Sequence, residues 1–149
     1  MGDALATQGK TAEAITALQK AISLNPKDAD AYNSSGVVLY EQGKLEEAIT
    51  AYQKAISLNP NDAKVYNNLG NALGMQGKLE GAITAHQKAI SLNPNDAKTY
   101  TNLGITLDKQ GKPADAIAAF QKAKDLYRFQ GDTLQADKIT QFLKQLGSR

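Results

Sequence analysis

The octapeptide QKAISLNP occurs three times in this sequence, at residues 19–26, 53–60 and 87–94, in steps of 34 residues. A fourth copy begins one step later at Gln121, but it reads QKAKDLYR and lacks the closing Asn-Pro pair. Self-similarity at a fixed period of roughly 20–50 residues is typical of proteins built by stacking one small unit on the next. The period therefore favours a repeat architecture before any other feature is considered.

One unit of the repeat, residues 29–62, predicts two helices joined by a short turn. Apolar residues recur through it at helical spacing, and Asp28 stands where a carboxylate can cap the first helix. Gly43 can adopt the left-handed conformation that ends helices. The second helix is expected from about Leu45 to Pro60, because proline has no backbone N–H and the residue before it avoids helical geometry.

Three glycines, Gly36, Gly70 and Gly104, recur at the same phase in the middle of the first helix of each unit. Glycine costs about 1 kcal/mol relative to alanine inside a helix, so its recurrence predicts a packing reason. We expect the two helices of a unit to approach closely there, with small residues on the partner helix at Ala48, Ala82 and Ala116.

The repeated residues also match a known pattern, in which Trp-x2-Leu-Gly-x2-Tyr is followed by Ala-x3-Phe and then by Pro over 34 residues. The second full unit reads Tyr66-x2-Leu69-Gly70-x2-Leu73, Ala82-x3-His86 and Pro94. The chain resembles a tetratricopeptide repeat (TPR) protein over nearly its whole length. The resemblance implies an all-α fold, a right-handed α-solenoid of helix-turn-helix units with a C-terminal capping helix.

The repeat phase divides the chain as one TPR domain. We expect a partial unit at 1–28, full units at 29–62, 63–96 and 97–130, and a capping helix at 131–149. The last copy lacks proline, so its helix can continue until Gly131 ends it and Asp132 caps the next one. One face of the capping helix should dock on the last repeat, through Leu134, Ile139, Phe142, Leu143 and Leu146.

The N-terminal unit is expected to be incomplete. Gly9 has the phase of Gly43, so the sequence predicts a turn at Gly9 and only half of a first helix before it. Two interpretations follow: the chain is the C-terminal piece of a longer array, or it begins with a naturally short helix that frays.

Composition and motifs favour a protein without catalytic activity. The net charge is +2, with 17 basic and 15 acidic residues interspersed, whereas nucleic-acid binders usually carry a concentrated basic stripe. No apolar run of about 18 residues predicts membrane insertion, and the lack of cysteine fits a reducing, cytoplasmic setting. His86, the single histidine, has the phase of core residues Tyr52 and Phe120. We expect no enzyme activity, cofactor or metal.

The resemblance places the first helix of each unit along a concave surface. Counting from Ala29, Ala63 and Ala97, positions two, five, six, nine, twelve and thirteen then share one stripe, which we call the groove stripe. Its candidate peptide-binding residues are Asn33, Lys64, Asn67, Asn68, Asn71, Lys98, Thr101, Asn102 and Ile105.

Asparagine is frequent on this stripe although it is a mediocre helix former. Its amide both donates and accepts, so Asn68 and Asn102 could form a ladder that holds the backbone of an extended peptide. The other interpretation is that these amides only solvate an exposed face. The family's carboxylate clamp is incomplete, because Asn102 stands where the resemblance implies an arginine. Looser peptide capture is therefore favoured over a receptor for chaperone tails.

The sequence thus predicts a non-catalytic scaffold that binds an extended peptide or a partner helix in a concave groove. One alternative is self-association to a homo-oligomer, through the apolar residues Ile15, Leu18 and Ile22 of the incomplete first unit. Another is that the chain is the substrate-guiding arm of a larger enzyme, such as a glycosyltransferase or a kinase.

Overall fold

The structure, a computed structural model, describes the backbone of residues 2–148 and the side chains of residues 8–148. Over this part the chain forms eight helices and no strand, and none of the helices is long and apolar enough to cross a membrane. The helices are α1 (Gly2–Leu24), α2 (Ala29–Glu41), α3 (Leu45–Leu58), α4 (Ala63–Met75), α5 (Leu79–Leu92), α6 (Ala97–Lys109), α7 (Pro113–Phe129) and α8 (Thr133–Gly147).

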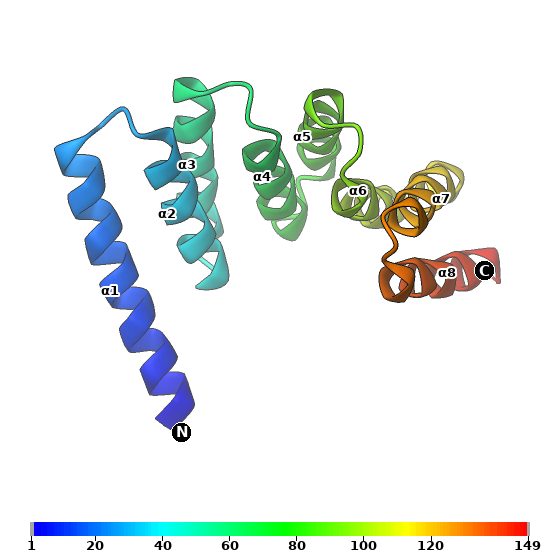
Figure 1. Cartoon of the computed structure of the whole chain (residues 1–149), viewed down its shortest axis with the longest axis horizontal. Helices are drawn as coiled ribbons and strands as arrows, with labels where there is room; N and C mark the ends of the chain where they lie inside the picture. Colours follow the sequence, from blue (N-terminus) through cyan, green and yellow to red (C-terminus); the bar gives the residue numbers. More distant parts are fainter. Residues whose placement is uncertain (1, 149) are drawn as a thin grey trace.

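The helices follow one another along an arc, each packed on the next (Figure 1). The pairs α2/α3, α4/α5 and α6/α7 repeat the same antiparallel hairpin, and each hairpin packs its first helix on the second helix of the preceding one. The predicted all-α solenoid is confirmed. Met1 and Arg149, the outer ends of the expected partial unit and capping helix, lie outside the described residues.

The helix boundaries follow the expected local signals. The carboxylate of Asp28 accepts a hydrogen bond from the backbone N–H of Ala31 at 3.2 Å, and three further aspartates each accept one from the first turn of the helix that they precede: Asp62, Asp96 and Asp132. Each hairpin turn contains a glycine in the left-handed region, with φ of 78° or 80°, namely Gly43, Gly77, Gly111 and Gly131. Starts and stops of helices are thus local properties of the repeat.

The mid-helix glycines make room for a ring rather than for an alanine. A Cβ added at Gly104 would lie 2.7 Å from Phe120 Cε1, which is closer than packed atoms can approach. The same contact joins Gly36 to the ring of Tyr52 and Gly70 to the ring of His86. The predicted close approach is therefore present, but its partner is the ring, while the expected alanines lie fully buried between the same two helices.

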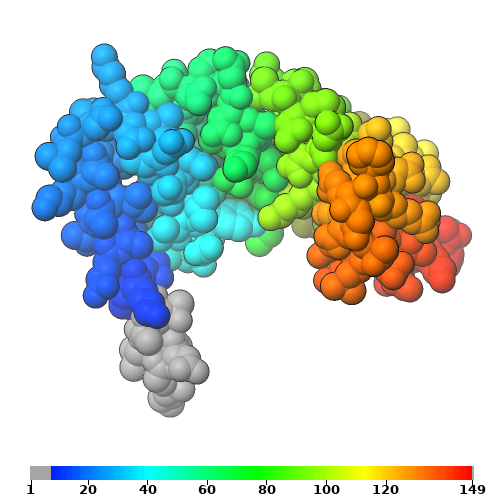
Figure 2. All heavy atoms as spheres, in the orientation of Figure 1, coloured from blue at the N-terminus to red at the C-terminus, as the bar shows by residue number. Residues whose placement is uncertain are grey.

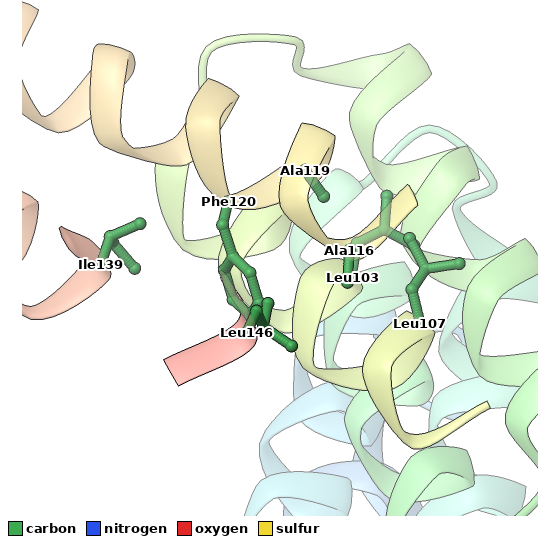
Figure 3. Packing of buried hydrophobic residues seen from close by; sticks show 7 residues of the cluster. All are labelled: Leu103, Leu107, Ala116, Ala119, Phe120, Ile139 and Leu146. Atoms are coloured by element: carbon green, nitrogen blue, oxygen red, sulfur yellow. The ribbon is translucent and has the colours of Figure 1, made fainter. Parts of the chain in front are cut away.

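The C-terminal end closes the core as a cap should. Because the fourth copy lacks the closing Asn-Pro pair of the octapeptide, α7 extends over 17 residues, compared with 14 in α3 and α5. Ile139 and Leu146 of α8 are buried in one cluster with Leu103 and Phe120 (Figure 3). Leu134 does not dock as expected: it is 65% exposed, because it lies in the first turn of α8, outside that cluster.

The N-terminal unit differs from the sequence expectation. No turn forms at Gly9, which lies inside the continuous helix α1 and has no positive φ. In the complete units the turn joins two helices that pack on each other, whereas the main packing partner of α1, in the part of the chain that the structure describes, is α2. None of the described side chains of α1 is fully buried, while Ala48, the equivalent of Ala14 in α3, is inaccessible to solvent.

Candidate functional site

The first helices of the units lie along the inner side of the arc. In Figure 1, α4, α6 and α8 are on the inner side and α5 and α7 on the outer side. Contacts between α2 and α4, and between α4 and α6, bring the inner helices together across units. The space-filling view shows the arc open between its two ends (Figure 2). The groove stripe lies on these inner helices.

Three hollows follow one another along the inner helices. The first, about 210 Å³, is lined by α2, α3, α4 and Lys98 of α6, and the second, about 110 Å³, lies between α2, α4 and α6; they share Tyr40 and Asn71. The third, about 270 Å³, is formed by α6, α7 and α8 and shares Ile105 and Lys109 with the second. The shared residues join the hollows into one continuous surface from α2 to α8, which we call the concave groove.

Two amide pairs cross between neighbouring inner helices in the groove. Asn68 donates through Nδ2 to Oδ1 of Asn33 at 3.1 Å, and Asn102 donates through Nδ2 to Oδ1 of Asn67 at 3.3 Å. Each donor stands one repeat plus one residue after its acceptor. Asn68 and Asn102 are half-buried and each keeps its side-chain oxygen and a second amide hydrogen without a partner among the described residues. Both can therefore still accept from and donate to a ligand.

Asn67 is a correction to the predicted set of binding residues. Its side chain is 7% exposed, and its Oδ1 lies 3.0 Å from Nδ1 of His86 as well as accepting from Asn102. The amide therefore links α4 to α5 and α6 inside the protein and does not face a ligand. The stripe prediction failed here because the side chain of Asn67 turns toward α5 of its own unit and α6 of the next one.

His86 is buried, as its repeat phase predicted. Because Oδ1 of Asn67 can only accept, Nδ1 of the neutral ring donates the bond at 3.0 Å and Nε2 carries a lone pair. Nε2 is buried without a hydrogen-bond partner among the described residues. Burial lowers the pKa of His86 from 6.5 to about 4, since the charged ring would lose its hydration. His86 is thus a neutral core residue at pH 7.

The remaining predicted residues divide between the groove and its edges. Asn71 and Ile105 line it, and Lys98 is an exposed cation beside the first hollow. Thr101 faces a separate hollow between α6, α7 and α8 that Tyr127 also lines, and its hydroxyl donates to the backbone oxygen of Ala97 at 3.0 Å. Burial is the main cause that raises the pKa of Tyr127. Lys64 is exposed and lies outside these hollows.

The prediction missed the contribution of α8 to the groove. Phe142, Gln145 and Leu146 line the third hollow together with residues of α6. The sequence did contain a signal for this contribution. Tyr40 and Asp108 occupy the same position of the groove stripe, and Phe142 follows Asp108 by one further step of 34 residues. The capping helix therefore also acts as a fourth inner helix.

The arrangement provides groups for binding. Amides, lysine ammonium groups and apolar walls lie side by side along the concave groove, a combination that can hold a chain with alternating polar and apolar contacts. In the described part of the chain, no three His, Cys, Asp or Glu side chains gather where they could hold a metal ion.

Comparison with known families agrees with this architecture. One profile, described as "TPR repeat", matches residues 2–43 and 36–77, and another, described as "Tetratricopeptide repeat", matches residues 63–129. The chain belongs to the tetratricopeptide repeat family, whose members serve as protein-interaction scaffolds.

Solved structures add a more particular likeness. The chain is similar to a crystal structure of MamA, with 26% identity and a TM-score of 0.75 over 99% of this chain and 93% of that one. It is also similar to MamA from Desulfovibrio magneticus RS-1, residues 41 to the end, with 32% identity and a TM-score of 0.77 over 87% and 73% of the two chains. A search of curated proteins found no match.

Proposed function

We propose that this protein is a non-catalytic scaffold that binds an extended peptide segment of a partner protein in the concave groove. The observation that carries the proposal is the coincidence of the amide pairs with the continuous row of hollows. Asn68 lines the first hollow and Asn102 the second, so unused hydrogen-bonding capacity recurs once per repeat along the groove.

The pairing between helices favours recognition over simple solvation. An amide held by a neighbouring side chain has lost part of its rotational freedom before a ligand arrives. Binding then orders fewer side chains, which reduces its entropic cost. Because peptide backbone groups are the same in every sequence, these amides provide affinity, while the apolar walls select among side chains.

The test is a double substitution of Asn68 and Asn102 by alanine. Peptides are first selected on the unaltered chain from a phage-displayed library of random sequences, and their affinities are then measured by isothermal titration calorimetry. A hydrogen bond contributes roughly 0.5–1.5 kcal/mol, so loss of both amides should weaken binding about ten-fold. The helix content should not change, because both side chains are half-buried rather than core residues.

A matched control substitutes Asn61 and Asn95, which lie in exposed turns and are also one repeat apart. Its peptide affinity should equal that of the unaltered chain. Equal affinity of the groove variant for the selected peptides, or an equal loss in the control, would contradict the amide-based mode of binding.

A second candidate function is self-association through α1. Within the described residues no first helix covers the face of α1 that carries Ala14, Leu18 and Ala21, whereas one covers the equivalent residues of α3, α5 and α7, and none of the three is fully buried. A second copy could cover this apolar face. Sedimentation velocity at several concentrations should then reveal a dimer, and Leu18→Asp should return it to the monomer. The control Gln19→Asp alters an exposed neighbour. A monomer at every concentration would remove this candidate.

A further inference from the structure

The third hollow of the groove is more apolar than the other two. Its floor consists of Phe120 and Leu146, which are almost fully buried, and its walls include Ile105 and Phe142, which are 36% and 38% exposed. The rings of Phe120 and Phe142 stack with their centroids 5.5 Å apart and their planes inclined by 25°. We call this hollow the C-terminal pocket.

The pocket is held by the core and open to the groove. Phe120 and Leu146 belong to the buried cluster that packs α8 on α6 and α7, so the floor of the pocket is part of the core (Figure 3). Stacking against Phe120 holds Phe142 at the rim. Apolar atoms exposed in such a concavity gain free energy when a ligand replaces the water, in proportion to the area covered.

The position of the pocket along the groove indicates which kind of group should occupy it. Ile105 belongs both to the pocket and to the hollow that contains Asn102, and it lies one helical turn after Asn102 on α6. A peptide held by Asn102 therefore passes the mouth of the pocket. At about 270 Å³ the pocket has room for one large side chain. Asp108, Lys109 and Gln145 also line it, but its floor is apolar, so a polar group that reached the floor would lose its hydration without a partner there.

We infer that the C-terminal pocket anchors one bulky apolar side chain, such as leucine, isoleucine, methionine or phenylalanine, of the peptide bound in the concave groove. The inference rests on the proposed peptide-binding function and adds a selectivity to it. Asn68 and Asn102 hold any backbone, whereas the pocket formed with α8 distinguishes between peptides. The capping helix thus serves the groove as well as the core.

A first experiment tests the pocket with small probes. N-acetyl-leucine methylamide should shift the NMR signals of the Leu146 methyl groups, and N-acetyl-serine methylamide should not. Phe142→Ala should weaken the shift, and so should Ile105→Asn, which introduces the residue that the preceding repeat has at the same position, Asn71. Phe129→Ala removes a phenylalanine that is 92% exposed on α7 and should have no effect. Equal shifts with both probes would overturn the inference.

A second experiment combines a peptide change with a pocket change. In a peptide selected on the unaltered chain, replacing its bulky apolar residue by serine should weaken binding about ten-fold or more. The same replacement should matter little to Phe142→Ala, because the two changes remove one contact. Independent effects would overturn the pocket assignment, even where the Asn68/Asn102 variant still loses affinity and the proposed function stands. Failure to select any peptide would overturn both.

Discussion

Replacing Phe120 by alanine is expected to lower the free energy of unfolding by about 3–5 kcal/mol, the range observed for large aromatic residues removed from protein cores. Phe120 is 2% exposed and contacts Gly104 of α6 and Phe142 of α8, and it belongs to the buried cluster that also holds Ile139 and Leu146. The cavity would be hard to close on the side of Gly104, because glycine has no side chain to move into it. Urea denaturation followed by circular dichroism measures the change.

The chain offers a matched control on the same helix. Phe129, at the end of α7, is 92% exposed, so Phe129→Ala should change the free energy of unfolding by less than about 0.5 kcal/mol. If the two alanine variants were equally stable, the ring of Phe120 would not be the element that joins the last repeat to its cap.

The stability of the protein should fall as the pH is lowered from about 6.5 to 4, in part because of His86. Its pKa is about 4 in the folded state and 6.5 ordinarily, so between these values the unfolded chain binds more protons. The free energy of unfolding then decreases with decreasing pH. At about 1.4 kcal/mol per pKa unit, the loss from this residue approaches about 3 kcal/mol once the pH is below the folded-state pKa.

The variant His86→Phe isolates this contribution from the titration of carboxylates. The corresponding position of the last repeat already holds Phe120 against Gly104, so a phenylalanine has a precedent against Gly70. Asn67 would keep its bond from Asn102. Denaturation curves at pH 7 and pH 4 should diverge less in this variant than in the unaltered chain. An identical pH dependence in both would show that His86 is not protonated on unfolding.

The concave groove could be predicted in outline but not residue by residue. Asn67 and Asn68 are adjacent residues of the same type, and the sequence placed both on the groove stripe. Stacking buries Asn67 against His86 and leaves Asn68 half-exposed in a hollow. Phe142 was assigned to the docking face of the cap, yet it also lines the groove. These distinctions depend on how far each helix is rotated about its axis relative to its neighbours. The spacing of residues within one helix carries no information about that rotation.

What the sequence determined by itself is the repeat: its period, its paired helices, their aspartate caps and their glycine turns. These features depend on interactions within a few residues, so each copy predicts them independently. Only the tertiary structure decided which equivalent positions behave alike. Gly43 turns the chain and Gly9 does not; Ala48 is fully buried and Ala14 is not. A side chain is buried, or a turn forms, only where a second helix packs against the first. At the ends of the array the neighbours of a unit differ, even where its residues are the same.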